Sequence, residues 1–129
     1  MKIIQTEKAP AAIGPYSQAI IFGGLVYTSG QIPISPETGA IVGATVSEQA
    51  ETVISNLKAV LETAGSSIEH VVKTTCFLTD MSAFSDFNVV YAKHFSGKPA
   101  RSCVEVTALP KGVLVEIEAI AEVAIGDDC

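Results

Sequence analysis

One arginine and two glutamates in the last third of the chain are the residues best suited to chemistry. Arg101 begins a strand-like run from Arg101 to Val106, and Glu116 and Glu118 lie in a second run from about Val113 to Val123. Side chains alternate along a strand, so the two glutamates share a face, and we expect Arg101 to face them on one sheet surface. An arginine matches a carboxylate through two parallel hydrogen bonds, and a glutamate can orient water or hold a proton. The pattern favours a small carboxylate substrate attacked by water, with a salt bridge between two strands as the alternative.

Four further residues have types and positions that fit a binding site. Tyr16 is presented by a turn, and Gly30 follows a strand-like run where its backbone could approach a ligand or turn sharply. Asn88 lies at the edge of the apolar stripe of a predicted helix, where its amide needs either a neighbouring loop or a pocket as partner; the stripe consists of Phe84, Phe87, Tyr91 and Phe95. Cys103 alternates with Arg101 and shares its face, but no histidine is near it in the sequence, so a packing role is favoured.

Several familiar catalytic patterns are missing from the sequence. Neither phosphate-binding glycine loop, GxGxxG or GxxxxGK[ST], occurs, and there is no GxSxG nucleophile motif. The two histidines, His70 and His94, fall at predicted element ends, where we expect them to be solvated. The three cysteines, Cys76, Cys103 and Cys129, are widely spaced and form no CxxC pair, with Cys76 expected in the core. We therefore expect no disulfide framework, no metal site and no cofactor.

Composition limits the class of protein. The 129 residues suit one domain spanning 1–129, and they are 48% hydrophobic but only 17% charged. A net charge of −6 argues against nucleic-acid binding through phosphate contacts. No apolar run approaches the length of a membrane helix, and the N-terminal segment lacks the apolar core of a secretory signal, so we expect a cytoplasmic protein. The low charge also suggests that a second copy covers apolar surface, although a well-packed monomer is the alternative.

Hydrophobic periodicity predicts the elements that position these residues. Helical spacing predicts helices over Ser47–Ala64, after a capping box at Thr45–Glu48, and over Ser82–Phe95. Alternation and β-branched content predict six strands, at Lys2–Thr6, Ala19–Phe22, Leu25–Ser29, Val71–Thr79, Arg101–Val106 and Val113–Val123. This order predicts an α+β two-layer sandwich, in which a mixed sheet carries both helices on one face. We expect Arg101, Cys103 and the glutamates on the opposite face, which a symmetric oligomer would cover.

Six segments spread over nearly the whole chain carry a resemblance to a known family. They are GPYSQA at 14–19, TSGQIP at 28–33, VVKTTCFLTDM at 71–81, FNVVYAKHF at 87–95, PARSCVEV at 99–106 and LPKGVLVEIEAIA at 109–121. In content and order these segments resemble the RidA family, also called YjgF. The resemblance implies a chorismate-mutase-like fold, a homotrimer, and pockets in the clefts between subunits.

The same resemblance implies an activity and roles for residues. Family members hydrolyse 2-imino and 2-enamino acids to 2-oxo acids and ammonia, without cofactor or metal. Arg101 resembles the arginine that holds the substrate carboxylate, and Glu116 resembles the residue that orients the attacking water. The positions that resemble pocket-lining residues are Tyr16, Ser29, Gly30, Asn88 and Cys103.

Two other functions stay open at the level of sequence. One is a non-catalytic module that binds small carboxylates, or a chaperone-like interaction protein, which the apolar composition would suit. The other is the ribonuclease activity attributed to relatives, which the acidic charge and the lack of a histidine pair disfavour.

Overall fold

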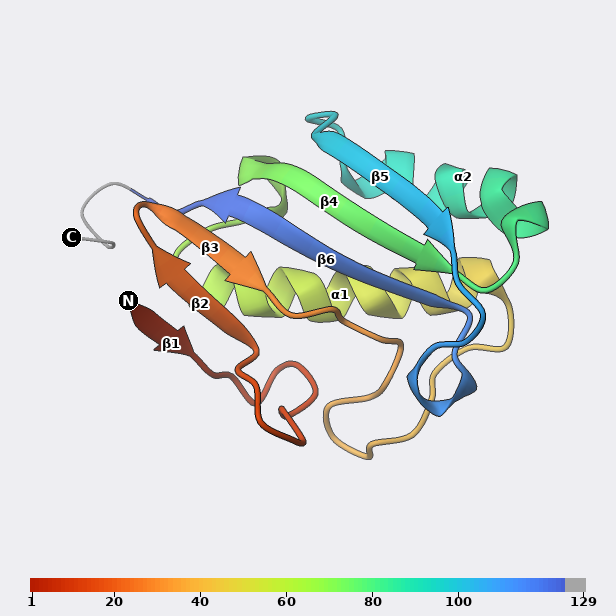
Figure 1. Cartoon of the computed structure of the whole chain (residues 1–129), viewed down its shortest axis with the longest axis horizontal. Helices are drawn as coiled ribbons and strands as arrows, with labels where there is room; N and C mark the ends of the chain where they lie inside the picture. Colours follow the sequence, from red (N-terminus) through yellow and green to blue (C-terminus); the bar gives the residue numbers. More distant parts are fainter. Residues whose placement is uncertain (125–129) are drawn as a thin grey trace.

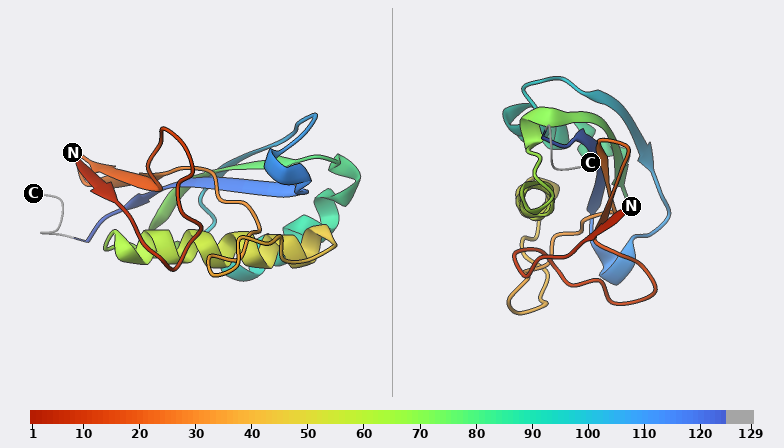
Figure 2. Two further views of the ribbon diagram at one scale, coloured as in Figure 1. Left: turned by 90° about the horizontal axis from the view of Figure 1, so that it is seen from below. Right: turned by 90° about the vertical axis from the view of Figure 1, so that its left-hand side faces the viewer.

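Six strands form one sheet, and both long helices pack against the same face of it (Figures 1 and 2). The computed structural model describes residues 1–124; Cys129, one of the three cysteines, lies outside this range. The strands are β1 (Lys2–Ile4), β2 (Ala19–Phe22), β3 (Leu25–Thr28), β4 (Val71–Leu78), β5 (Ala100–Glu105) and β6 (Val115–Glu122). The helices are α1 (Val46–Thr63) and α2 (Phe84–His94). The predicted two-layer α+β architecture is confirmed, and the element bounds differ from the predictions by one or two residues at most ends.

The sheet is mixed, as predicted. Its strand order is β1-β2-β3-β6-β4-β5, so β4 separates β5 from β6. The pair β4 and β5 is parallel because α2 connects them as a crossover, whereas the other neighbouring pairs are antiparallel. The strand that carries Arg101 is therefore not the hydrogen-bonded neighbour of the strand that carries Glu116.

Helix α1 begins at a complete capping box. The Thr45 hydroxyl accepts from the Glu48 amide at 3.2 Å, and Glu48 Oε1 accepts from the Thr45 amide at 3.2 Å. Gly65, just past the helix, has the positive φ of 82° that glycine tolerates best. The predicted apolar stripe is buried against the sheet and consists of Val46, Ala50, Val53, Ile54, Leu57, Leu61 and Ala64.

Helix α2 begins later than predicted, at Phe84 instead of Ser82, because a short 3-10 turn precedes it. Asp80 accepts from the Ser82 amide at 2.9 Å, and Glu105 of β5 accepts from the Met81 amide at 2.8 Å. These two carboxylates satisfy amides that would otherwise lack partners at the start of the helical segment. The end of β5 is thereby tied to the beginning of α2.

The alternation predicted for β6 is confirmed, and it fixes the two faces of the sheet. The positions facing the helices are Val115, Ile117, Ala119 and Ala121, all buried. Neither helix of the described residues is long and apolar enough to cross a membrane.

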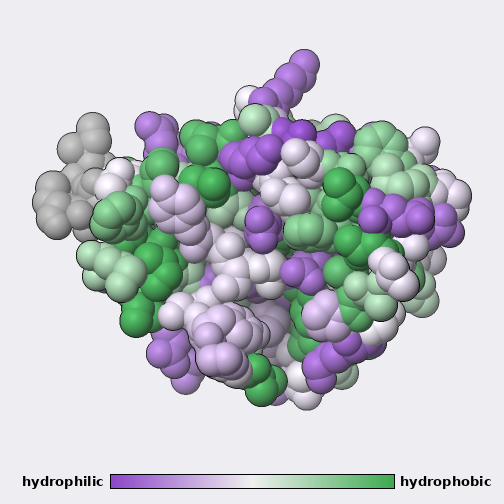
Figure 3. Space-filling model, viewed as in Figure 1, coloured by the Kyte–Doolittle hydropathy of each residue, from purple (hydrophilic) through white to green (hydrophobic). Residues whose placement is uncertain are grey.

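No helix formed by residues 1–124 covers the other sheet face, which points toward the viewer in Figures 1 and 3. Hydrophobic and hydrophilic side chains alternate in patches over this face (Figure 3). Ile3, Phe22, Tyr27 and Val104 keep 63%, 65%, 41% and 44% of their surface exposed. An apolar sheet face of this kind is typical of a surface that another chain covers.

Candidate functional site

The Arg101 side chain is fixed by contacts to α2. Its Nη1 donates to Asn88 Oδ1 at 2.8 Å. The guanidinium carbon lies 4.7 Å from the centre of the Tyr91 ring and 5.5 Å from that of Phe84. A cation beside aromatic rings is stabilised by their quadrupoles, and the amide fixes its orientation. The partner of the Asn88 amide oxygen is therefore Arg101 of β5, whereas the sequence left a neighbouring loop and a pocket as the alternatives.

The predicted meeting of Arg101 with the glutamates on one sheet face is wrong. In the parallel β4–β5 register Arg101 lies beside Thr74, a fully buried residue that faces the helices. Glu116 alternates with the buried Val115 and Ile117, so it points to the open face. Within one chain, the arginine and the glutamates therefore lie on opposite sides of the sheet.

The error has a local cause on β5. Arg101, Cys103 and Glu105 share a face as predicted, but that face is the helix side, whereas Ser102 and Val104 face outward. Because β5 is an edge strand that α2 covers only in part, no residue of it is fully buried. Its sequence alternation therefore does not reveal which side faces the core.

Two cysteines lie beside each other under Arg101. Cys103 of β5 is the register partner of Cys76 of β4, and both are free thiols. Burial raises the pKa of Cys76 to about 12. Burial also raises the pKa of Cys103, although the Arg101 cation acts in the opposite direction. Cys76 is a core residue as predicted, and Cys103 lies next to the guanidinium with a thiol that favours its neutral form.

Glu116 opens into a cavity of about 940 Å³ at one end of the open face. The lining includes three residues named from the sequence, Tyr16, Ser29 and Gly30, together with Glu118. Desolvation raises the pKa of Glu116, and the negative charge of Glu118 raises it further. A half-buried carboxylate with a raised pKa holds and releases a proton closer to neutral pH than an ordinary glutamate does.

The Glu116 carboxylate, where it lies, leaves no room for a side chain at residue 30. A Cβ placed on Gly30 would lie 2.7 Å from the Glu116 carboxylate carbon and closer still to Oε2. The sequence predicted that Gly30 allows a close backbone approach. The group that approaches is the carboxylate of this chain's own glutamate.

Hydrogen bonds hold the loop around Gly30 in place. Gln31 and Ile117 exchange backbone hydrogen bonds at 2.8 and 3.2 Å, and the Ser29 hydroxyl donates to the Ser17 carbonyl at 2.6 Å. Buried Asn56 of α1 donates to the carbonyls of Ile32 and Ile34 at 3.1 and 2.9 Å. These hydrogen bonds therefore hold in place the backbone segments that carry Gly30 and Glu116.

The predicted site residues thus form two groups. The arginine group contains Arg101, Asn88 and Cys103, and the glutamate group contains Glu116, Tyr16, Ser29 and Gly30. Sequence reasoning gave no site role to Phe84, Tyr91 or Thr74. The first two were placed in an apolar stripe, and only the spacing of Tyr91 from Asn88 linked it to the site.

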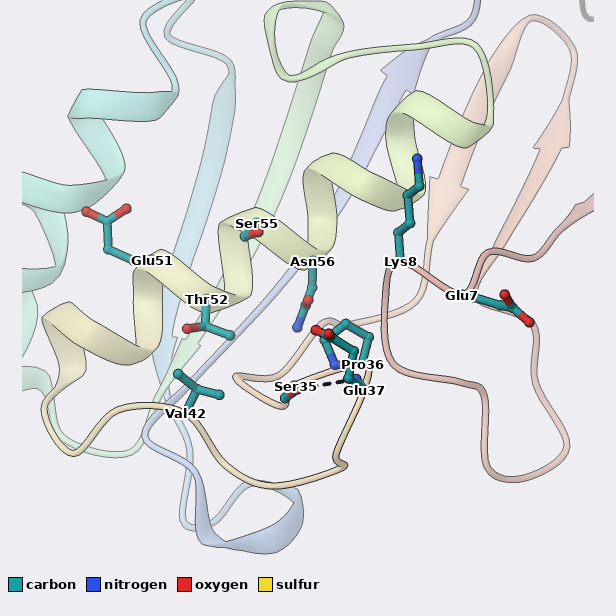
Figure 4. A pocket seen from close by; sticks show the side chains of 10 residues that line it. All are labelled: Glu7, Lys8, Ser35, Pro36, Glu37, Val42, Glu51, Thr52, Ser55 and Asn56. Carbon is teal, nitrogen blue, oxygen red and sulfur yellow. Dashed lines mark hydrogen bonds between the residues drawn. The ribbon is translucent and has the colours of Figure 1, made fainter.

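A separate cavity of about 590 Å³ lies between α1 and the 35–42 loop (Figure 4). Its lining includes Glu7, Lys8 and Glu51, and it contains none of the predicted site residues. Glu51 binds Lys93 and also His94, whose Nε2 lies 2.7 Å from Glu51 Oε1. His94 was expected to be solvated, but it forms part of a polar contact between the two helices.

Comparison with known proteins identifies the family. The model of the family described as Endoribonuclease L-PSP matches residues 6–123. A Salmonella typhimurium protein named 2-iminobutanoate/2-iminopropanoate deaminase is 52% identical over 124 residues, which cover 93% of this chain and 96% of that protein.

Solved structures of relatives have the same fold. Yeast Mmf1 has a TM-score of 0.92 at 46% identity, covering 95% of this chain and 98% of that one. Escherichia coli TdcF, solved with bound serine, has a TM-score of 0.91 at 47% identity, covering 96% of this chain and all of TdcF. The chain therefore belongs to the endoribonuclease L-PSP family, the family of the RidA proteins.

Proposed function

We propose that this protein hydrolyses 2-imino and 2-enamino acids to 2-oxo acids and ammonia, in a site that two copies of the chain share. The main observation in support is that Arg101 and Glu116 lie on opposite sides of the sheet, each in an ordered environment suited to one part of the reaction. One copy supplies the arginine group, and its neighbour supplies the glutamate group. A relative that is 52% identical is named for this activity.

In this proposal Arg101 holds the substrate carboxylate. Asn88 occupies one donor of the guanidinium, and the fork geometry leaves others for a carboxylate. Because the side chain is already oriented, less conformational entropy is lost on binding. The related TdcF structure contains serine, a small molecule that carries such a carboxylate.

Glu116 handles the proton of the attacking water. The protonated imine carbon is electrophilic, and water adds to it to give a carbinolamine while Glu116 accepts one proton. Return of that proton to the amine nitrogen lets the C–N bond break; the hydroxyl oxygen then gives up its proton as the carbonyl of the 2-oxo acid forms, and the departing ammonia takes that proton to become ammonium. In total, one iminium carboxylate and one water give one 2-oxo acid and one ammonium ion, so atoms and charge balance. The raised pKa of Glu116 suits this exchange near neutral pH.

The open sheet face supports the sharing of the site. Apolar side chains are exposed there, including Tyr27 on β3, the neighbour of the strand that carries Glu116, and Phe22 on β2, the next strand along. A symmetric oligomer would cover them, and we propose the homotrimer that the family resemblance implies. Its clefts would place the arginine edge of one copy against the cavity of the next.

The direct test measures imine decay. A threonine dehydratase generates 2-iminobutanoate, and the loss of this species is followed with and without the protein. We expect faster loss with the parent chain and no acceleration with Arg101→Ala. Binding of 2-oxobutanoate without any acceleration by the parent chain would instead support a non-catalytic carboxylate-binding module.

A mixing experiment tests the sharing. Arg101→Ala and Glu116→Gln chains, each inactive, are unfolded together in equal amounts and refolded. If each site takes its arginine from one copy and its glutamate from another, about a quarter of the sites in random mixed oligomers are complete. Mixtures that stay inactive after exchange of subunits, shown by mass spectrometry, would rule out a shared site.

A further inference from the structure

We infer that Tyr91, held in place by Thr74, is a positioning residue that fixes the Arg101 guanidinium for carboxylate binding. The inference rests on the proposed function for its consequence in catalysis. The positioning itself is a property of the described chain and can be tested alone.

The geometry begins with a buried hydroxyl pair. Tyr91 Oη of α2 lies 2.7 Å from Thr74 Oγ1 of β4, in a hydrogen bond where either atom can donate. Thr74 is fully buried and Tyr91 is 8% exposed. A buried hydroxyl pair is costly to break, because Tyr91 Oη would lose its partner and Thr74 Oγ1 would keep only the weak Cys76 thiol donor at 3.9 Å. The bond therefore fixes the tilt of the Tyr91 ring relative to β4.

The same two residues are tied to Arg101 by separate means. Thr74 is the register partner of Arg101 in the parallel β4–β5 pair, and the Tyr91 ring centre lies 4.7 Å from the guanidinium carbon. Backbone pairing, a hydroxyl bond and a cation–ring contact thus join Thr74, Tyr91 and Arg101 in a closed triangle. Asn88, one turn before Tyr91 on α2, adds the hydrogen bond that sets the rotation of the guanidinium.

A second aromatic contact keeps the ring from shifting. Phe95, at the end of α2, stacks on Tyr91 with ring centres 4.3 Å apart and planes at 21°. Phe87 approaches Tyr91 at 5.7 Å and 44°. Phe84 is on the same helix as Tyr91, and its ring centre lies 5.5 Å from the guanidinium carbon of Arg101. The guanidinium therefore packs against an ordered aromatic wall, which limits the directions in which it can move.

The experiment compares four variants. Tyr91→Phe and Thr74→Val each remove one hydroxyl, the double variant removes both, and Tyr91→Leu removes the ring. Val90→Ala is the matched control, because Val90 is a buried residue of α2 that takes part in none of the ring contacts of Tyr91 or Arg101. The readouts are kcat and KM for the imine, the Kd for 2-oxobutanoate, and the NMR shift of Arg101 Nε–H.

Loss of the ring should raise KM and Kd about tenfold, as expected for a cation–ring contact in a desolvated site. The value of kcat should change much less, because the chief loss is in carboxylate binding. Tyr91→Phe and Thr74→Val should give smaller increases that do not add in the double variant, since both break one bond. The Arg101 resonance should lose its ring-current shift in Tyr91→Leu and keep it in Val90→Ala.

Two results would overturn the inference. One is an Arg101 resonance that does not change in Tyr91→Leu. The other is an equal rise of KM in Tyr91→Leu and Val90→Ala, which would assign the effect to general loosening of α2. If the parent chain shows no imine turnover and no binding of 2-oxobutanoate, the proposed function fails, while the resonance still decides whether Tyr91 positions Arg101.

Discussion

Glu116 occupies the space that a side chain on residue 30 would need, so the carboxylate and Gly30 form one steric unit. The contact joins the start of β6 to the loop after β3, and it places the glutamate against backbone in a cavity of about 940 Å³. The position of the carboxylate thus depends on the absence of a single methyl group.

Gly30→Ala should therefore reduce activity far more than stability. The added Cβ would collide with the flexible end of Glu116, which can turn aside at little cost to the fold. We expect kcat for imine hydrolysis to fall at least about tenfold, because displacement of a catalytic group by about 1 Å has effects of this size. Thermal unfolding should change little, and a variant with parental kcat would show that the glutamate need not lie there.

Asn88 offers a test of charge as well as position. Asn88→Ala removes the acceptor of the Arg101 hydrogen bond, and Asn88→Asp keeps an acceptor but adds a negative charge that competes with the substrate carboxylate. Binding of 2-oxobutanoate, measured by calorimetry, should weaken in both variants and more in Asn88→Asp. Thermal stability should follow the opposite order, with Asn88→Asp more stable than Asn88→Ala. Tighter binding in Asn88→Asp than in Asn88→Ala would contradict the role of Arg101 as carboxylate holder.

Glu116→Gln should make the folded chain more stable at neutral pH. The raised pKa means that the folded chain binds the proton more tightly than the unfolded chain, whose value is near the ordinary 4.5. This contribution is complete below 4.5 and is lost as the pH rises through the folded pKa. Urea unfolding should show the variant more stable than the parent at pH 7 and no longer so at pH 4.

Glu118→Gln is the companion variant, because it removes the neighbouring charge that raises the pKa of Glu116. The acidic limb of the activity profile should move to lower pH in this variant. An unchanged profile would mean that another group sets that limb.

Asn56→Ala should destabilise the loop that carries Gly30. The amide donates to the carbonyls of Ile32 and Ile34, and its loss leaves both with a weaker set of partners in a buried region. We expect a cost of about 2 kcal/mol in urea unfolding. Asn56→Asp, which has nearly the same shape but no donor, should be at least as costly. A loss below about 0.5 kcal/mol would show that water replaces the amide.

The two described cysteines should differ in reactivity. With a pKa of about 12, Cys76 should resist iodoacetamide at pH 8 until the chain unfolds, whereas the partly buried Cys103 should react slowly in the native state. Arg101→Ala should slow the reaction of Cys103, because the cation stabilises its thiolate. Peptide mass spectrometry assigns the label to each cysteine, and faster labelling of Cys103 in that variant would refute the electrostatic argument.

The sequence predicted the fold well because each element has a strong local signal. The capping box before α1 and the alternation of β6 set the helix start and the buried strand face with little ambiguity. The facing of β5 could not be predicted in this way. Its side is decided by pairing with Thr74 and Cys76 of β4, a long-range contact that leaves no trace in the alternation of β5 itself.

The site residues illustrate the same limit. Arg101 and Glu116 stand out by type, and Gly30 by its position after a strand, but their grouping depends on strand order. The insertion of β4 between β5 and β6 separates them, and no spacing in the chain encodes that insertion. The sequence did not indicate a site role for Tyr91, because its ring is as compatible with a buried apolar stripe as with a contact to a cation.

The placement of arginine and glutamate on opposite sides of one sheet has a consequence for how the protein responds to dilution. A solitary folded chain could present only one of the two groups to any small molecule. Turnover by such a pair would fall more steeply than protein concentration once subunits separate, even though every chain kept its native fold. If the proposed shared site is right, chains diluted below the concentration at which subunits associate would stay folded without turnover.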